Sequence, residues 1–490
     1  MAASFVRRCL LPLALVLAAL LGACSSIQYQ VNAPLDAYAP QQGYRLGTLQ
    51  TVQGTDERIF MVVLFSGGGA RAAALGYGVL EELARYRFAA QGASKRLFDE
   101  ISVVYSVSGG SMLAAYYGLK GDGIFADFER RFLDQNLQDK ITGSIVSVAN
   151  LWRLTSPRFG RSDLVQEQLD NALFQGATFD DLLHRRKGPF VVISATDMSS
   201  GGRFDFTQDF FDLICSDLGK FPIARAVAAS SAVPLVFSPI TLWNYAGSCG
   251  YQPSGALLAA SMRQSRGPRA QAARSLSQEL LGYLERDQRR YVHLLDGGLS
   301  DNLSIRGILD MATLIDSDTL KQRLHLEKTT EYVVVLVNAQ NDITHTIDQS
   351  ADVPGLAEVV RAVSDIPINR YTEESELQME SAIERWRAAA ESEAQKRHNA
   401  PPSFYYINVG LKNLSDEAER DTLLNVPTTL YLPRASVQHL KRAAASLLND
   451  SMDFRRLVDD LAATREAGAP DSRPAPVAPP AAGGATMPGD

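Results

Sequence analysis

The chain has 490 residues, of which 46% are hydrophobic, so it is long enough to bury one large core or two moderate ones. Its formal net charge is −7, and acidic and basic residues are interspersed along it, which argues against nucleic acid as a partner. We therefore expect a globular protein without a basic binding face.

The first 23 residues have the pattern of a secretory signal peptide. Arg7 and Arg8 precede an apolar run over residues 9–21, and small residues follow. The run is shorter than the ~20 residues that a membrane-spanning helix requires, which disfavours the alternative of a permanent anchor helix. The letters LGAC at 21–24 resemble the lipobox of bacterial lipoproteins. This resemblance implies cleavage before Cys24, lipidation of Cys24 and attachment to a membrane through its acyl chains.

The residues after Cys24 indicate where the protein is located and how its N-terminal segment is organised. Ser25 and Ser26 follow Cys24, and no Asp stands there. By resemblance to lipoproteins of two-membrane bacteria, this favours the outer membrane of the cell envelope, with the protein facing the periplasm. Residues 24–57 are polar and lack sustained periodicity, so we expect them to form a tether that holds the domain away from the lipid.

The body of the chain alternates between short apolar runs rich in branched residues and longer helical patterns. This alternation predicts βαβ units and a mostly parallel sheet, that is, an α/β fold. No internal repeat or linker divides the region, so residues 58–465 are predicted to form one domain. Strands are expected at 59–65, 101–106, 189–197, 291–298, 331–339 and 404–410, and helices at 71–86 and from about residue 110.

Two longer segments, 125–183 and 250–290, interrupt this alternation. Such insertions either cover an active site or form ordinary peripheral helices, and the sequence leaves both open. Further along, Met379, Ile383 and Trp386 recur at helical spacing, which predicts a helix face that docks on the core.

Three consecutive glycines, Gly67, Gly68 and Gly69, follow the first predicted strand after Ser66. With Ala72 they fit the loose dinucleotide pattern G-x-G-x-x-[GA]. The next strand, however, ends in Ser106 rather than in an acidic residue, and no Gly-Lys-Ser/Thr of a P-loop follows the glycines. The better hypothesis is that the backbone N–H groups of residues 67 to 69 form an oxyanion hole for acyl transfer.

The second predicted strand leads into Ser106-Val107-Ser108-Gly109, a near match to the G-x-S-x-G nucleophile elbow. In that motif a sharp turn between strand and helix holds a serine above the sheet, with small neighbours on either side. Ser108 is therefore the candidate nucleophile, and an ordinary turn serine is the alternative. Ser106 stands where the pattern has glycine, which makes the motif less specific.

A serine nucleophile needs a base, and Asp296 is the candidate. It stands near the end of the strand predicted at 291–298 and is followed by Gly297 and Gly298; an ordinary Asp-Gly turn is the alternative. Free aspartate, with a pKa of about 3.9, is a poor base at neutral pH, so burial would have to raise the pKa. A Ser-Asp-His triad with His293 is the second mechanism to consider, although the usual chain order places the histidine after the acid.

Two cysteines remain beyond the signal region, Cys215 and Cys249. In an oxidising envelope compartment we expect a disulfide between them, closing a loop of about 35 residues and stabilising the fold by roughly 3–4 kcal/mol. Two unrelated buried thiols are the alternative. Residues 466–490 are dense in Pro, Ala and Gly, which predicts a disordered tail.

Taken together, these motifs resemble the patatin-like phospholipase family, over about residues 59–305. The resemblance rests on the oxyanion loop, the elbow, a helix-to-strand segment and an Asp-Gly-Gly element, which occur in the family's order. They are Gly67 to Arg71, Ser106 to Gly109, Ala226 to Ile240 and Asp296 to Gly298, and Asn302 also fits the pattern.

The resemblance implies a three-layer α/β/α fold with a mostly parallel central sheet, and a Ser-Asp dyad. Ser108 would attack the carbonyl of a lipid ester, Asp296 would accept and return the proton, and water would release the acyl-enzyme, as in a phospholipase A or lysophospholipase. Arg71 would orient the loop or attract a phosphate head group; a helix-surface arginine is the alternative.

No cofactor and no metal is implied, because HExxH, paired CxxC and calcium-loop spacings are absent from the sequence. Phospholipid, lysophospholipid and neutral ester all remain as substrates. A catalytically silent envelope lipoprotein, which uses the fold as a binding scaffold, is the alternative from another functional class.

Overall fold

The structure is a computed structural model that describes residues 27–48, 55–264, 266–341, 348 and 350–466. The predicted signal peptide, Cys24 and residues 467–490 of the predicted tail lie outside these ranges, so what the sequence indicates for them stays a prediction. Within the ranges, no helix combines the length and the apolar character that crossing a bilayer requires.

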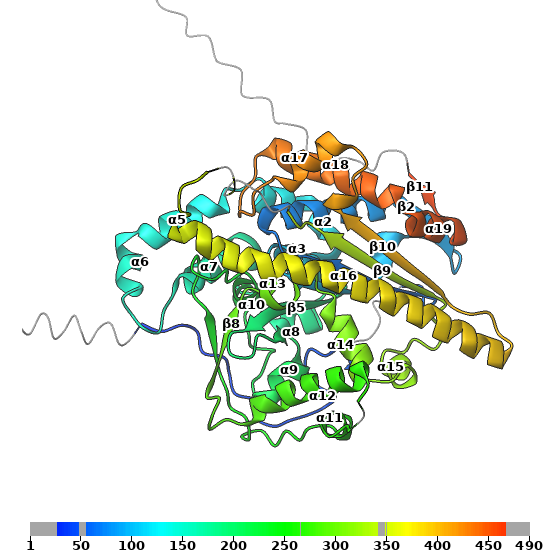
Figure 1. The fold of residues 1–490 in the computed structure, drawn as a ribbon, viewed down its shortest axis with the longest axis horizontal. Helices are drawn as coiled ribbons and strands as arrows, with labels where there is room; N and C mark the ends of the chain where they lie inside the picture. The colour runs from blue at the N-terminus through cyan, green and yellow to red at the C-terminus, as the bar shows by residue number, and fades with distance from the viewer. Residues whose placement is uncertain (1–26, 49–54, 265, 342–347, 349, 467–490) are drawn as a thin grey trace, which may run out of the picture.

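A large sheet forms the centre of the fold (Figure 1). Its strands are β1 (Ile59–Phe65), β4 (Ile101–Val107), β5 (Phe190–Asp197), β6 (Arg203–Asp205), β7 (Ile240–Trp243), β8 (Tyr291–Leu295), β9 (Glu331–Asn338) and β10 (Ser403–Gly410). They lie in the order β10-β9-β1-β4-β5-β8-β7, and β6 pairs with β5 off this path. Neighbours from β10 to β5 are parallel, whereas β8 is antiparallel to β5 and to β7. The predicted mostly parallel sheet is confirmed.

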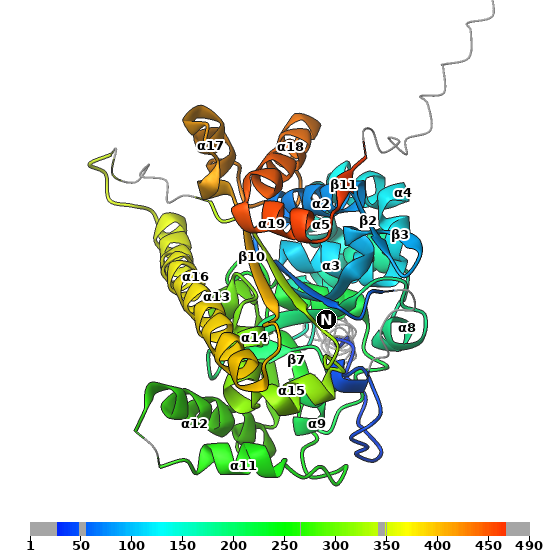
Figure 2. The same ribbon diagram turned by 90° about the vertical axis from the view of Figure 1, so that its right-hand side faces the viewer.

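Helices cover both faces of the sheet, which gives the three expected layers (Figure 2). Alternate residues of β10 point to opposite layers: Tyr405 donates a hydrogen bond to Asp460, and Asn408 donates one to Glu376. Asp460 belongs to the layer of α2 (Gly69–Arg85), α3 (Gly109–Lys120), α18 (Arg434–Asp450) and α19 (Met452–Asp460). Glu376 belongs to the layer of α13 (Gly298–Asp301), α14 (Arg306–Leu314) and α16 (Leu356–Arg397).

The remaining helices lie mostly in the two insertions. The first insertion packs α7 on α10, and the second packs α12 on α14. These helices are α4 (Ile124–Phe128), α5 (Leu137–Val146), α6 (Val148–Arg153), α7 (Arg161–Leu169), α8 (Phe179–His184), α9 (Gln208–Leu213), α10 (Ile223–Ser230), α11 (Gly255–Ser261), α12 (Pro268–Leu281), α15 (Ser317–Arg323) and α17 (Glu417–Leu424). Neither insertion contributes a hydrogen bond to Ser108 or Asp296 among the described residues.

The predicted elements are found close to their expected places. Each of the six predicted strands coincides with an observed one, and α2 begins at Gly69, two residues before the expected start. The docking face expected on α16 is confirmed, since Met379 and Ile383 are buried and Trp386 packs against the core. Buried branched side chains on β1 and its neighbours explain why these runs form the interior of the sheet.

A small sheet was not predicted. It has the order β11-β2-β3 and consists of β2 (Tyr86–Ala90), β3 (Ala93–Arg96) and β11 (Thr464–Arg465). The hairpin between β2 and β3 turns through Gln91 and Gly92, at φ values of 52° and 78°. Positive φ at both turn positions matches the twist of a tight hairpin. Gln, unlike Asn, Asp or Gly, does not indicate such a turn in a sequence.

The tether expected at residues 24–57 is wrong for the part that is described. Residues 27–48 lie against the domain: the hydroxyl of Tyr44 donates to the carbonyl of Val191, and the Tyr44 ring stacks on Phe190. Arg45 forms ion pairs with Asp209 and Asp212. A buried aromatic side chain and a paired arginine anchor a segment whose polar composition resembles that of a linker.

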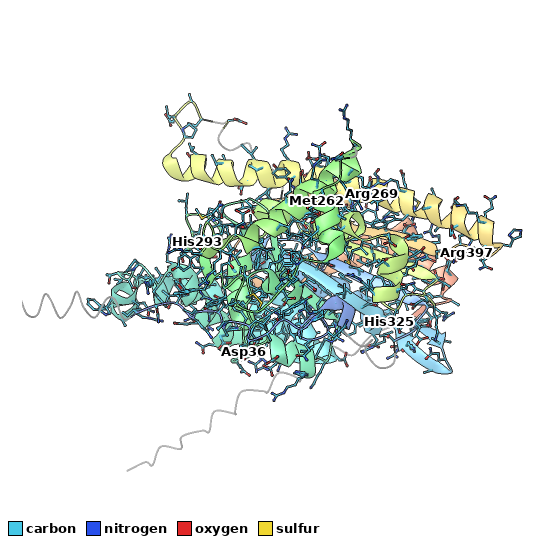
Figure 3. The ribbon with its side chains drawn as sticks, turned by 90° about the horizontal axis from the view of Figure 1, so that it is seen from below. Asp36, Met262, Arg269, His293, His325 and Arg397 are labelled. Atoms are coloured by element: carbon cyan, nitrogen blue, oxygen red, sulfur yellow. A yellow bond between two sulfur atoms is a disulfide. The ribbon has the colours of Figure 1, made fainter. Side chains whose placement is uncertain are left out.

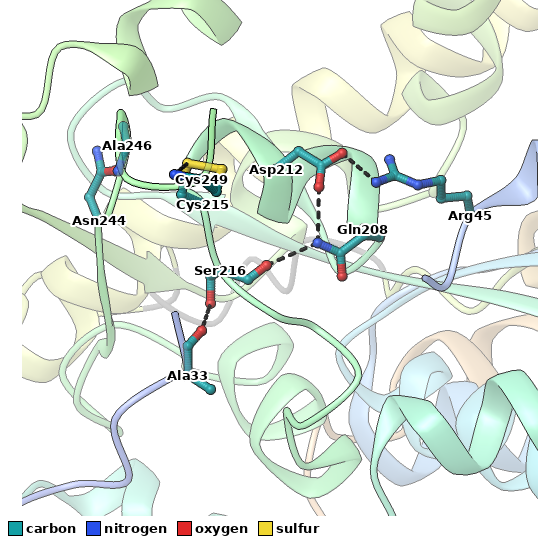
Figure 4. Close-up of a disulfide and its surroundings, with 9 residues drawn as sticks. All are labelled: Ala33, Arg45, Gln208, Asp212, Cys215, Ser216, Asn244, Ala246 and Cys249. Carbon is teal, nitrogen blue, oxygen red and sulfur yellow. Dashed lines mark hydrogen bonds and ion pairs between the residues drawn. A yellow bond between two sulfur atoms is a disulfide. The ribbon is translucent and has the colours of Figure 1, made fainter. Parts of the chain in front are cut away.

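The predicted disulfide is present, and it holds the same N-terminal segment (Figure 4). Cys215 and Cys249 are bonded, and the carbonyl oxygens of both accept backbone hydrogen bonds, from Leu35 and Tyr38 respectively, each at 2.8 Å. The hydroxyl of Ser216 also donates to the carbonyl of Ala33 at 2.8 Å. The disulfide therefore links the two segments to which residues 33–38 are hydrogen-bonded, as well as closing its own loop.

Candidate active site

The predicted glycine loop and the predicted elbow leave the sheet at the same edge. β1 and β4 are parallel neighbours, with Phe65 paired to Ser106, so the residues that follow each strand emerge side by side. The glycines then begin α2, and Ser108 precedes α3. In an open parallel sheet the carboxyl ends of the strands are where reaction sites are built.

Ser108 has the strained backbone of a nucleophile elbow. Its φ is 51° and its ψ is −122°, a conformation that costs a residue with a Cβ about 1–3 kcal/mol. The turn is tight because a Cβ on Gly109 would lie 2.1 Å from the carbonyl oxygen of Gly69, and one on Gly110 would lie 2.6 Å from that of Ser66. Only glycine fits at both places.

Ser106 fills the elbow position where the pattern has glycine, and the structure accommodates it. Its side chain is fully buried, and the hydroxyl donates to the carbonyl of Val192 on β5 at 3.0 Å. The departure from the pattern therefore leaves no buried polar group of Ser106 unsatisfied.

The side chains of Ser108 and Asp296 meet at this edge. The hydroxyl Oγ of Ser108 lies 3.0 Å from Oδ2 of Asp296, in hydrogen-bonding contact. The other carboxylate oxygen, Oδ1, accepts the N–H of Gly298 at 2.8 Å. Gly297 must be a glycine, since a Cβ there would lie 2.3 Å from the carbonyl oxygen of Ser194.

The surroundings of Asp296 change its acidity in the direction that a base requires. The residue is only 7% exposed, and burial raises the pKa of its carboxyl to about 6, against the lowering effect of the hydrogen bonds from Gly298 and Ser108. Desolvation disfavours the charged form of the carboxyl, whereas the two hydrogen bonds favour it. The effect of desolvation on the pKa is the larger. A carboxyl with this pKa is ionised at neutral pH and still able to take up a proton.

The glycine loop offers two backbone donors rather than the predicted three. The N–H of Gly67 already donates to the carbonyl of Asn302 at 3.0 Å, so the oxyanion role expected for Gly67 is not open to it. The N–H groups of Gly68 and Gly69 donate to no acceptor in the described part of the chain. Gly69 has a φ of 61°, and a Cβ on it would lie 2.3 Å from the carbonyl oxygen of Thr429, so the loop requires glycine there.

Arg71 is buried rather than a surface or head-group-binding residue. It is 1% exposed, and it donates to the carbonyls of Ala339 and Val426 and to the hydroxyl of Thr428. Burial lowers the pKa of its guanidinium to about 10. Of the roles that the sequence left open, the structure supports orientation of the glycine loop, through the hydrogen bonds of Arg71 to residues 426 and 428.

The described histidines form no hydrogen bond with the dyad. His293 is on the exposed side of β8, where its Nδ1 is 3.0 Å from Oγ1 of Thr241, and Figure 3 shows His293 and His325 on separate parts of the molecule. None of the histidines in the described ranges has a hydrogen bond to Ser108 or Asp296. His345 is outside those ranges.

A cavity of about 570 Å³ lies beside His293, lined by Ser199, Ser200 and residues 287–291. Neither Ser108 nor Asp296 lines it. This cavity is therefore separate from the Ser108–Asp296 pair. In the part of the chain that the structure describes, no cluster of His, Cys, Asp and Glu side chains has the arrangement of a metal site.

Two contributors to the site were missed from the sequence. Ser230, at the end of α10, contacts the backbone of Ser108, and Thr429 accepts the N–H of Ala70 at 2.7 Å. The segment AVAASSAVP did contain Ser230, but nothing in its pattern distinguishes that serine from Ser231. Residues 426–429 follow the region of family resemblance by more than a hundred positions and carry no motif.

Comparison with known families decides the assignment. The profile described as patatin-like phospholipase matches residues 63–309, just over half of the chain. The chain belongs to the patatin-like phospholipase family. Both the Ser108 elbow and the Asp-Gly-Gly element lie inside the matched region, and membership of this family supports lipid acyl hydrolase activity. No curated protein matches the chain in sequence.

Solved structures that align with the chain include a human phospholipase A2 and VipD. Human GIVD cytosolic phospholipase A2 is 11% identical with a TM-score of 0.40, covering 85% of this chain and 62% of that one. The same enzyme in complex with methyl gamma-linolenyl fluorophosphonate is 12% identical, with a TM-score of 0.36 and coverage of 83% and 59%. VipD from Legionella pneumophila is 13% identical, with a TM-score of 0.24 and coverage of 85% and 71%. This patatin-like chain thus spans about three fifths of the human enzyme.

Proposed function

We propose that this patatin-like chain is a serine lipid acyl hydrolase that works through a Ser108–Asp296 dyad. The observation that carries the proposal is the 3.0 Å hydrogen bond between Ser108 Oγ and Asp296 Oδ2, made by a serine in a strained elbow. A nucleophile held by its own base is the arrangement that covalent acyl transfer requires.

The proton moves between the same two side chains in both halves of the reaction. Ser108 Oγ attacks the ester carbonyl carbon while its proton passes to Asp296 Oδ2. When the tetrahedral intermediate collapses, the bond from the carbonyl carbon to the alcohol oxygen breaks, and Asp296 returns the proton to the leaving alkoxide. Water then attacks the acyl-enzyme, giving its proton to Asp296, and Ser108 regains that proton as the fatty acid leaves.

The N–H groups of Gly68 and Gly69 would hold the oxyanion of each tetrahedral intermediate. Their loop contacts the elbow, since the Gly69 carbonyl packs against Gly109, and Arg71 and Thr429 fix its position. Donors that are positioned before the reaction stabilise the developing charge without reorganising, and the loss of one such donor reduces the rate by ~10²–10³-fold.

We also propose that Cys24 is lipidated and attaches the enzyme to the outer membrane on its periplasmic side. The support is the LGAC segment followed by two serines. Such an enzyme would meet phospholipids first, which makes phospholipids and lysophospholipids the first substrates to test. Mass spectrometry of the mature N-terminus of wild type and Cys24→Ser tests the anchor. An unmodified Cys24 in the mature wild type contradicts it.

The dyad is tested by fluorophosphonate labelling together with hydrolysis of phosphatidylcholine and lysophosphatidylcholine. We expect wild type to be labelled at Ser108 and to release fatty acid, and Ser108→Ala to do neither. Asp296→Asn should lose both activities by about 10²–10⁴-fold, because Ser108 then lacks its base. His293→Ala should keep both.

The remaining outcomes separate the alternatives. Loss of activity in His293→Ala contradicts the dyad in favour of a triad. A folded wild type that is neither labelled nor active contradicts catalysis altogether and favours the scaffold function. Thermal unfolding of each variant shows whether a lost activity reflects a lost fold.

A further inference from the structure

Ser230 is the last residue of α10, and its fully buried hydroxyl connects the elbow to the sheet. Its Oγ accepts the backbone N–H of Ser108 at 2.8 Å and donates to the carbonyl of Ser194 on β5 at 2.7 Å. The roles are unambiguous, because an amide can only donate and a carbonyl can only accept. The single hydroxyl proton therefore points to Ser194, which leaves a lone pair for the Ser108 amide.

The C-terminal end of α10 also holds the backbone of Asp296 and Gly297. The carbonyl of Ser230 accepts the N–H of Gly297 at 3.1 Å, and the carbonyl of Ala232 accepts the N–H of Asp296 at 3.0 Å. The end of α10 thus contacts the backbone of the nucleophile on one side and that of the base on the other. The hydroxyl of Ser230 is the link to Ser108.

The hydrogen bond between the Ser108 amide and Ser230 Oγ holds a strained part of the backbone. Ser108 is strained at a φ of 51°, and such a conformation persists only where the surroundings impose it. The carbonyl of Ser108 is held by the amide of Ser111 at 2.9 Å and by the Ser111 hydroxyl at 2.6 Å. Its amide is held by Ser230. Without that acceptor, the peptide preceding Ser108 could rotate and carry Oγ away from Asp296.

We propose that Ser230 is a positioning residue for the acyl-transfer reaction, which fixes the Ser108 backbone so that Oγ stays aligned with Asp296. This role rests on the proposed function, and it concerns the chemical step rather than substrate binding. Loss of the hydroxyl should therefore lower kcat and leave KM nearly unchanged, since a small misplacement of the attacking atom slows the reaction strongly.

The matched control is Ser194→Ala. Ser194 is also buried near the elbow, and its hydroxyl donates to Asp205 at 2.7 Å, away from Ser108. The substitution removes a buried hydrogen bond of similar length, but it leaves the Ser194 carbonyl that Ser230 uses. A decrease in kcat that occurs in Ser230→Ala but not in Ser194→Ala then indicates misalignment of Ser108 rather than general loosening of the core.

The experiment measures kcat and KM on a soluble short-chain ester, and the rate of fluorophosphonate labelling at Ser108, for wild type, Ser230→Ala, Ser230→Thr and Ser194→Ala. We expect Ser230→Ala to lose about 10–100-fold in kcat and in labelling rate, with KM within about threefold of wild type. Ser230→Thr, which keeps the hydroxyl, should recover most of that loss. Ser194→Ala should stay within about threefold.

Where Ser230→Ala does not fold, Ser230→Cys keeps a buried side chain with a weaker donor and acceptor, and it should show a smaller fall in kcat at unchanged KM. Equal kcat in wild type and in the folded Ser230 variants overturns the positioning role while Ser108 labelling in wild type still supports the dyad. A fall in Ser194→Ala as large as that in Ser230→Ala also overturns it. A folded wild type that is not labelled overturns both.

Discussion

Ser108 and Asp296 are 188 positions apart in sequence, and their side chains are in contact because one strand aligns them both. β5 lies between β4 and β8, with Val107 paired to Ser194 in parallel register and Leu295 paired to Thr196 in antiparallel register. Ser108, which follows Val107, and Asp296, which follows Leu295, therefore both lie beside residue 195 of β5. The opposite directions of β4 and β8 bring Ser108 and Asp296 to β5 from its two sides.

The strain at Ser108 predicts a difference between two inactive variants. Ser108→Ala and Ser108→Gly both lack the nucleophile, but only glycine adopts a φ of 51° and a ψ of −122° without a Cβ clash. We expect Ser108→Gly to be more stable than Ser108→Ala by about 1–2 kcal/mol, after allowance for the greater unfolded-state entropy of glycine. Urea unfolding of the two variants measures this, and equal midpoints at equal slopes contradict a strained elbow.

The raised pKa of Asp296 predicts the pH dependence of the reaction. Below its pKa of about 6 the carboxyl is protonated and cannot accept the Ser108 proton, so kcat/KM should rise with pH through about 6 and level off above about 7. Burial also raises the pKa of Asp301 to about 6, but its carboxylate accepts the amides of Ile305 and Arg306 instead of contacting Ser108. The step should therefore persist in Asp301→Asn. A profile without a step between pH 5 and 7 contradicts Asp296 as the base.

The same shift predicts how stability responds to Asp296→Asn. The folded-state pKa of Asp296, about 6, lies above its usual value of 3.8, so the folded state holds the proton more tightly. This contribution is fully present below about pH 4 and is lost as the pH rises through 6, which costs wild type about 2–3 kcal/mol. Asparagine does not ionise. The stability of Asp296→Asn relative to wild type should increase by that amount between pH 4 and 7.5.

Urea unfolding of both proteins at several pH values measures this difference. Other buried carboxyls with raised pKa values, such as those of Asp212 and Asp301, are common to both proteins and cancel in the comparison. A stability difference that is independent of pH contradicts the burial of an ionisable Asp296.

Much of the fold and the two residues of the candidate dyad could be predicted, because they depend on local pattern. Buried parallel strands consist of branched apolar runs, and Ser108 and Asp296 each stand at the end of such a run beside small residues. Their distance could not be read from the sequence, because it depends on the antiparallel placement of β8 beside β5. Local patterns also did not predict the hairpin through Gln91.

The errors arise where long-range partners decide the outcome. Arg71 lies in a helical pattern, and only the packing of residues 426–429 shows that it is buried. The amide of Gly67 is unavailable because Asn302, on a distant segment, accepts it. The polar N-terminal segment is fixed by Tyr44 and by the partners of the disulfide, none of which its own composition reveals.

Gly69 offers a test of the contact between the glycine loop and the C-terminal region. In Gly69→Ala the new Cβ would lie 2.3 Å from the carbonyl oxygen of Thr429, at a φ of 61° that disfavours side chains. Backbone on both sides must shift, so we expect a loss of several kcal/mol in stability, or a displaced loop with at least about 10²-fold lower kcat. Gly92→Ala is the control, since it has a φ of 78° but no atom within 4 Å of the new Cβ, and it should cost only about 1–2 kcal/mol with kcat unchanged. Thermal unfolding and ester hydrolysis of both variants measure these effects. If the two glycines respond alike, backbone strain alone explains the result, and close packing of Thr429 on the loop is contradicted.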